Sequence, residues 1–112
     1  MKNMSFFMTT DQVRNKTKTV TRRFGWLKVK PGNLIQPVVK GMGLKLGEKV
    51  ENIGGPIRVV SVRREPLCNI DKADCIREGF PDKTPDQFIH MLVWHYQCGR
   101  TDEVTRIEFE YV

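Results

Sequence analysis

The sequence is poor in the residues that build disulfide frameworks and metal centres. Of its 112 residues only three are cysteines, Cys68, Cys75 and Cys98, and only two are histidines. An odd number of cysteines without a C-x-x-C pair argues against a disulfide framework. A zinc site built from His90, His95, Cys98 and a distant cysteine would match no compact zinc motif. We therefore expect buried structural thiols, no metal and no other cofactor.

Long apolar runs are also missing. The longest clusters, such as "HMLVWHY", are interrupted by polar side chains and fall far short of the roughly 20 residues that span a membrane. The first residues do not follow a signal-peptide pattern. With 39% hydrophobic and 29% charged residues, the chain is predicted to be one cytoplasmic domain, residues 1–112, without a membrane partner.

Acidic residues are scarce in the first part of the chain. Residues 1–47 contain ten Lys or Arg and one acid, Asp11, whereas residues 48–112 contain nine basic and twelve acidic residues. A strongly basic half attracts polyanions such as RNA. The same charge also fits a solvated loop, or a surface that docks an acidic protein, and charge alone does not separate these alternatives.

The hydrophobic patterns predict several strands with short helices inserted among them. Pro37 confines its strand to a sheet edge or a bulge. The expected elements are a strand over 5–10, a brief helix over 11–15, an extended stretch over 19–30, a strand over 33–40, a glycine-rich loop or hairpin over 41–55, a strand over 56–67, helices over 71–79 and 84–97, and a strand over 103–112.

The two later helices have the clearest boundaries. Thr84 is a typical N-cap and is followed by a proline at the first helical position. Asp71 is a candidate cap for the shorter helix, which Gly79 should end. Apolar residues at helical spacing should face the core, namely Phe88, Ile89, Leu92 and Tyr96. These elements predict an α+β fold, a small mixed β-barrel with two or three short helices.

The order of these elements resembles a known family. "KTVTRR" follows a short helix, and "LKVKPGNLI" reads as a turn and a strand; then come "IRVVSV", a helical insert ending near "REGF", an amphipathic helix and a final "IEFE" strand. This arrangement is similar to the ASCH domain, a PUA-like β-barrel, over roughly residues 4 to 112. The glycine-rich stretch at 41–55 departs from the family pattern.

The resemblance implies two kinds of function. Many ASCH domains are considered RNA binders. A small bacterial subgroup resembles amidohydrolases that remove acyl groups from N(4)-acetylcytidine and related nucleosides. That subgroup uses a lysine, a threonine three residues later and a glutamate in the helical insert, which fall here on Lys18, Thr21 and Glu78.

The three residues could each supply one of the groups that amide cleavage requires. Amide cleavage needs a nucleophile, a base and a group that stabilises the oxyanion. Thr21 supplies a hydroxyl, and Lys18 can remove its proton only if burial and nearby arginines lower the lysine pKa. Glu78 could orient the lysine or pass a proton to the leaving ring. A pairing with Glu78 would, however, favour charged lysine, and the sequence does not resolve that conflict.

Strand geometry sets a condition on this hypothesis. Residues i and i+3 of a regular strand point to opposite faces, so Lys18 and Thr21 could not share a pocket on one flat strand. The hypothesis therefore requires a bulge, a turn or a strand start between them. A regular strand from 17 to 23 would count against it.

Three further residues are candidate substrate-binding groups. Arg23 could hold a phosphate or a base carbonyl, Trp26 could stack on a base, and Thr19 adds a hydroxyl to the same stretch. The alternatives are a surface cation for Arg23 and core packing for the neighbouring aromatic rings.

Three functions follow from these observations. The first is an amidohydrolase with a closed, nucleoside-sized pocket and a small-molecule nucleoside substrate. The second is an RNA-binding module with an open groove and an affinity that falls steeply with salt. The third is an interaction protein whose basic face docks an acidic partner. Because the lysine, threonine and glutamate all occur where the subgroup has them, the enzyme is the leading hypothesis.

Overall fold

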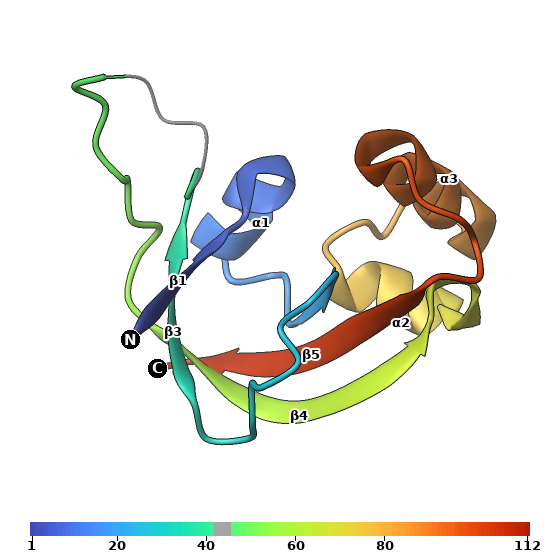
Figure 1. The fold of residues 1–112 in the computed structure, drawn as a ribbon, viewed down its shortest axis with the longest axis horizontal. Coiled ribbons are helices and arrows are strands. Elements are labelled where there is room, and N and C mark those ends of the chain that lie inside the picture. The colour runs from blue at the N-terminus through green and yellow to red at the C-terminus, as the bar shows by residue number, and fades with distance from the viewer. Residues whose placement is uncertain (42–45) are drawn as a thin grey trace.

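The computed structural model describes residues 1–41 and 46–112, and these residues form an α+β fold, as predicted (Figure 1). The expected loop over 41–55 lies partly outside the described residues. The elements in chain order are β1 Lys2–Ser5, the 3-10 helix η1 Phe7–Thr9, α1 Thr10–Arg14, β2 Val20–Arg23, β3 Leu34–Val38, β4 Ile57–Pro66, the 3-10 helix η2 Leu67–Asn69, α2 Lys72–Arg77, α3 Pro85–Tyr96 and β5 Glu103–Tyr111.

The strands form one open sheet in the order β1-β3-β4-β5-β2, and not the closed barrel that we predicted. β1 pairs with β3 in parallel, and the other neighbouring strands are antiparallel. Within the described residues, β1 and β2 are the two edges and do not pair with each other. The guanidinium of Arg23, the last residue of β2, instead lies 4.6 Å from the centre of the ring of Phe6, the residue that follows β1.

The longest pairing in the sheet is the β4–β5 ribbon, which curves beneath the three α-helices in Figure 1. The register shifts between Val59 and Ser61, so Val60 forms a bulge. β5 is rich in β-branched and aromatic residues, which favour a strand. Residues 104–107 are all buried, so both faces of this central strand are covered.

Two apolar clusters lie along the sheet. The first packs β1, β3 and the C-terminal half of β5 against α1 and includes Phe6, Val13 and Phe109. The second packs α2 and α3 against the start of β5 and includes Phe88, Leu92 and Val104. Arg106 lies between Val104 and Ile107 on β5, so a charged group separates the two clusters.

The predicted caps of α2 and α3 are confirmed. The Asp71 side chain accepts a hydrogen bond from the Asp74 amide, and Thr84 forms a capping box with Gln87. Phe88, Ile89 and Leu92 are buried as predicted, but Tyr96 is 42% exposed because it lies at the C-terminal end of the helix.

Two other predictions are corrected by the structure. The first strand covers Lys2–Ser5 and ends before the "FFMTT" segment, most of which forms η1 and the start of α1. Of the three cysteines only Cys75 is buried, while Cys68 is exposed and Cys98 is half-buried; all three are free thiols. No helix among the described residues combines the length and apolar character needed to cross a membrane.

Candidate active site

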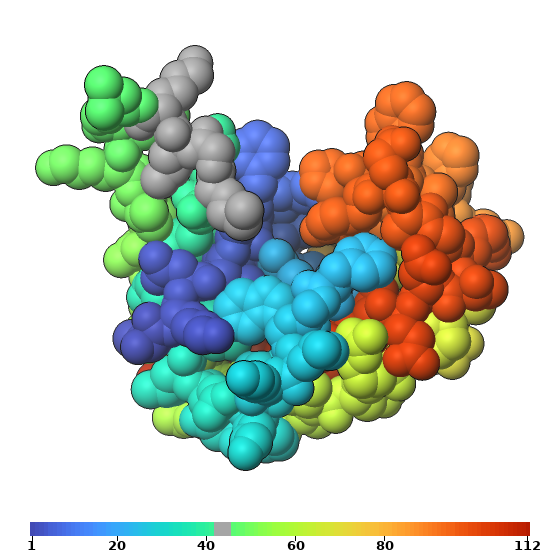
Figure 2. Space-filling view, viewed as in Figure 1, coloured from blue at the N-terminus to red at the C-terminus, as the bar shows by residue number. Residues whose placement is uncertain are grey.

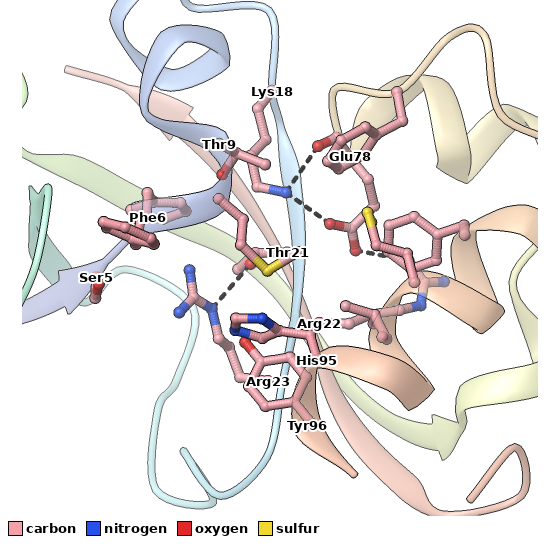
Figure 3. A pocket seen from close by; sticks show the side chains of 16 residues that line it. Ser5, Phe6, Thr9, Lys18, Thr21, Arg22, Arg23, Glu78, His95 and Tyr96 are labelled. Carbon is pink, nitrogen blue, oxygen red and sulfur yellow. Dashed lines mark hydrogen bonds and ion pairs between the residues drawn. The ribbon is translucent and has the colours of Figure 1, made fainter. Parts of the chain in front are cut away.

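A cavity of about 160 Å³ lies between the two apolar clusters. Its apolar wall comes from η1 and its neighbour Phe6 on one side and from Phe80 and α3 on the other. Figure 2 shows the surface hollowed between η1 and α3. Its polar lining includes Lys18, Thr21, Arg23 and Glu78, shown in Figure 3. The structure therefore brings four of the predicted site residues into one cavity.

Lys18 is held in a defined position before β2. Its side chain is only 2% exposed, and its ammonium nitrogen donates to the backbone oxygen of Glu78 at 2.8 Å and to Oε1 of the same residue at 2.6 Å. The hydroxyl of Tyr111 donates to the Lys18 carbonyl at 2.6 Å. The ammonium group and the backbone carbonyl of Lys18 are thus both fixed by residues distant in the sequence.

The pKa of Lys18 is lowered from its usual value, mainly because burial disfavours the charged amine. The carboxylate of Glu78 opposes this effect, and the positive charges of Arg23 and Arg22 add to it. Burial outweighs the ion pair, so Lys18 loses its proton more easily than a free lysine does.

The geometric condition on Lys18 and Thr21 is met. β2 begins at Val20, so Lys18 precedes the regular strand and is not bound by its alternation. Both side chains line the same cavity and are almost fully buried.

Thr21 has a cationic hydrogen-bond donor beside it. Nε of Arg23 donates to the Thr21 hydroxyl oxygen at 3.0 Å, and the guanidinium carbon lies over the Phe6 ring, 4.6 Å from its centre. A hydroxyl oxygen that accepts from a cation has its developing negative charge stabilised when its proton is removed. Burial lowers the pKa of Arg23, while Tyr96 and Glu78 act in the opposite direction.

Glu78 ends α2, as predicted, and is 3% exposed. The next residue, Gly79, has φ +96°, and a Cβ there would lie 2.7 Å from Cγ of Gln12. Nε2 of Gln12 also donates to the Gly79 carbonyl at 3.3 Å. The contact between α1 and the end of α2 therefore fixes the backbone that carries Glu78, and only glycine fits it without strain.

Glu78 also belongs to a buried network of ion pairs. Arg22 donates to Glu78 at 3.1 Å, to Glu65 at 3.0 Å and to Asp74 at 2.6 Å. Arg106 binds both oxygens of Asp74, at 2.7 and 3.0 Å. Because one oxygen of Glu78 is taken by Arg22, only the other faces Lys18.

Asp74 is ionised at the centre of this network. Burial alone would raise its pKa, but hydrogen bonds from Arg106, Arg22 and Arg77 outweigh burial and hold the pKa well below the usual range. For Glu65, likewise, the pairs with Arg63 and Arg22 outweigh burial and lower the pKa.

Sequence reasoning missed most of this network. Asp74, Glu65 and Arg106 were not predicted to be site residues, although Asp74 and Glu78 are four apart and therefore share one helix face. It also missed Phe6 and His95 as lining residues of the cavity. The i, i+4 acidic pair was the one signal in the sequence that pointed to a buried cation.

Two predicted substrate-binding residues lie away from the cavity. Trp26 borders a separate open hollow with Lys2 and Lys28, and the Lys2 ammonium lies 5.9 Å from the centre of its ring. The backbone of Thr19 makes two hydrogen bonds. Its N–H donates to the Arg77 carbonyl, and its own carbonyl accepts from the Phe109 N–H. Neither is among the residues that line the cavity with Lys18, so the structure does not bring these two predicted residues together with the other four.

The histidines and cysteines do not gather around a common point. Across residues 1–41 and 46–112, no group of three or more His, Cys, Asp or Glu side chains is arranged to hold a metal ion. His90, His95 and Cys98 therefore form no such group with a further ligand.

Comparison with known proteins identifies a solved structure of similar fold but no family. No protein-family model matches the sequence, and no curated protein is significantly similar to it. The crystal structure of protein EF3133 from Enterococcus faecalis, described by the family model DUF984, has a similar fold with a TM-score of 0.57. The alignment covers 94% of this chain and 67% of that one at 18% sequence identity, so the likeness concerns architecture alone.

Proposed function

We propose that this chain is an ASCH-type, PUA-like domain that hydrolyses the amide bond of N(4)-acylated cytidine or cytosine. The observation that carries the proposal is the convergence of Lys18, Thr21 and Glu78 in one cavity, although 60 residues separate the lysine from the glutamate. A cytoplasmic setting remains part of the same proposal.

The proposed reaction begins with neutral Lys18. Its amine takes the proton of the Thr21 hydroxyl as the oxygen attacks the acyl carbon, and Arg23 stabilises the negative charge that develops. The tetrahedral intermediate collapses, the C–N bond breaks, and the Lys18 ammonium returns the proton to the leaving amino nitrogen of the cytosine. An ester between Thr21 and the acyl group remains.

A water molecule then completes the cycle. Neutral Lys18 takes a proton from this water as it attacks the ester, and the acyl group leaves as a carboxylic acid that ionises at neutral pH. Thr21 regains its proton from the lysine. Glu78 fixes the amine through its backbone oxygen and Oε1, so it acts here as the group that orients the base.

The size of the cavity limits how much substrate it holds. At about 160 Å³ it is smaller than the roughly 300–1,000 Å³ of pockets that enclose a whole drug-sized ligand. In our proposal the acyl group and the reacting edge of the ring enter the cavity, and the ribose stays outside it.

The test is hydrolysis of N(4)-acetylcytidine, followed by the loss of its ultraviolet absorbance. Lys18→Ala, Thr21→Ala and Glu78→Ala should each lower kcat by about 100-fold or more, because each removes a group that acts in the transition state. Thr17→Ala and Lys28→Ala are matched controls at exposed positions and should keep wild-type turnover. Circular dichroism would establish that every variant is folded.

RNA binding is the second candidate function, and one observation favours it. Trp26, Lys2 and Lys28 border an open hollow of about 1070 Å³ that joins basic groups to an aromatic ring. If wild type does not hydrolyse the substrate, but binds single-stranded RNA with a steep salt dependence that Lys28→Ala weakens, this function replaces the enzyme.

A further inference from the structure

Arg23 differs from the other cations of the cavity in having no acidic partner. Lys18 and Arg22 both pair with Glu78. Within residues 1–41 and 46–112, by contrast, no carboxylate lies within ion-pairing distance of Arg23, and the only hydrogen bond of its side chain is from Nε to Thr21. Its two terminal nitrogens therefore retain four N–H donors without an acceptor among the described residues.

These free donors belong to a side chain of the cavity wall. Arg23 is half-buried and lines the cavity, and Figure 3 shows its guanidinium between Phe6 and Thr21 with the terminal nitrogens turned away from the threonine. The Phe6 ring lies 4.6 Å from the guanidinium carbon, and the terminal N–H groups remain for a ligand. Burial disfavours the charge of Arg23, and an anion beside it would compensate that cost.

We propose that Arg23 forms a carboxylate-binding subsite within the cavity. Its planar fork of N–H donors matches the two oxygens of a carboxylate. A short aliphatic monocarboxylate places its ionised end on Arg23 and its alkyl end against the apolar wall formed by Phe80, Phe88 and Leu92.

Charge favours a carboxylate over a phosphate group. One unpaired guanidinium balances a single negative charge, whereas a phosphate monoester carries about −1.5 to −2 at neutral pH. The other two cations of the cavity, Lys18 and Arg22, already pair with Glu78, Glu65 and Asp74, so among the described lining residues a second negative charge would find no free lysine or arginine.

The source of the carboxylate rests on the proposed function. Hydrolysis of an acylated cytosine releases an acid next to Thr21, and Nε of Arg23 already donates to the hydroxyl of that residue. The acid product is then held where the next acyl group must bind. The subsite therefore makes simple carboxylates competitive inhibitors of the enzyme.

The first experiment measures binding without any reaction. Sodium acetate and sodium butyrate are titrated into the protein and followed by amide chemical shifts, with acetamide as the neutral ligand of the same shape. We expect saturable shifts for the carboxylates around the cavity, and none for acetamide. Equal binding of acetate and acetamide, or no binding of acetate at all, would overturn the subsite.

Variants then locate the binding. Arg23→Gln removes the charge and should weaken carboxylate binding by about 10- to 100-fold, because a charge-assisted hydrogen bond is lost. Arg23→Lys keeps the charge and should bind more weakly than wild type because it lacks the fork. Arg58→Gln makes the same charge change at an exposed residue paired with Glu110, and should bind as wild type does. Unchanged affinity in Arg23→Gln would overturn the proposal.

The outcome separates this inference from the proposed reaction. Carboxylate binding that depends on Arg23, in a protein that does not hydrolyse N(4)-acetylcytidine, supports the subsite and rejects the reaction. Hydrolysis that butyrate does not inhibit competitively rejects the subsite and leaves the reaction standing.

Discussion

At the scale of single residues, Lys18 is a buried amine subject to two opposing influences. Burial lowers its pKa, and the ion pair with Glu78 raises it. Arg22 donates a hydrogen bond to the other oxygen of Glu78, and this second cation weakens the stabilisation that the carboxylate gives to protonated Lys18. The network behind Glu78 thus bears directly on the protonation of the proposed base.

The proposed role of Lys18 predicts a particular pH dependence. Since only the neutral amine accepts a proton, log kcat should rise with pH by about one unit per pH unit and level off above the lowered pKa of Lys18. Steady-state rates on N(4)-acetylcytidine across the alkaline range would measure this profile.

Lys18→Arg is the matching variant, because arginine keeps the positive charge but does not lose its proton. Its turnover should fall by at least about 100-fold at every pH. Wild-type turnover in this variant, or a wild-type rate that falls as the pH rises through neutrality, would exclude Lys18 as the base.

At the scale of secondary structure, the junction of α1 with the end of α2 positions the carboxylate of Glu78. Gly79→Ala would place a methyl group against Gln12 and strain a backbone with φ +96°. Because Glu78 precedes this residue, the variant should lose more than about 1–2 kcal/mol of unfolding free energy and several-fold in kcat. Urea denaturation and steady-state rates would measure both quantities.

Gly54→Ala is the matched control for that change. Gly54 also has a positive φ, +62°, but an added Cβ there meets nothing within 4 Å. This variant should lose only the backbone cost, about 1–2 kcal/mol, and keep wild-type kcat. Equal effects of the two variants on turnover would show that the α1–α2 contact does not position Glu78.

Local signals made some elements predictable from the sequence. The start of α3 was predicted correctly because Thr84 and its capping partner are neighbours in the chain. β4 and β5 were predicted from their β-branched and aromatic residues. The end of α3 was less predictable: Tyr96 follows the helical spacing of buried residues but packs against Phe24 and His95 at the surface.

The site was only partly predictable, for a physical reason. The resemblance placed Lys18, Thr21 and Glu78, but the start of β2 that lets the first two share a cavity depends on pairing with β5. The burial of Arg106 depends on Asp74, 32 residues away, and no local pattern encodes such a pair. The barrel prediction was wrong because strand number and order do not specify whether the edges of a sheet pair.

At the scale of the whole molecule, the buried acids predict sensitivity to low pH. The folded-state pKa values of Asp74 and Glu65 are lowered, so the stability they contribute is complete above their unfolded values of about 4. That stability is lost as the pH falls below this range. Thermal unfolding measured from pH 7 down to pH 2 should show a progressive decrease in Tm below about pH 5.

Asp74→Asn tests the origin of this decrease. The variant should be less stable by about 3–5 kcal/mol at pH 7, because three arginines lose their carboxylate, and its Tm should fall less steeply below pH 5. Asp86→Asn makes the same charge change in an exposed pair with Arg100 and should retain the wild-type profile. If the Tm of Asp74→Asn falls with pH as steeply as that of wild type, groups other than Asp74 cause the acid sensitivity.

The position of β5 has a consequence for how the protein is made. A ribosome synthesises this strand after the other four, yet β5 lies between β4 and β2 in the sheet. Until it emerges, β4 and β2 have unpaired backbone edges, which are sites for association with other chains. Arg106, which holds Asp74, and Tyr111, which holds Lys18, arrive with the same strand. A nascent chain therefore lacks both a protected sheet and an assembled cavity, and it acquires the two in a single late step.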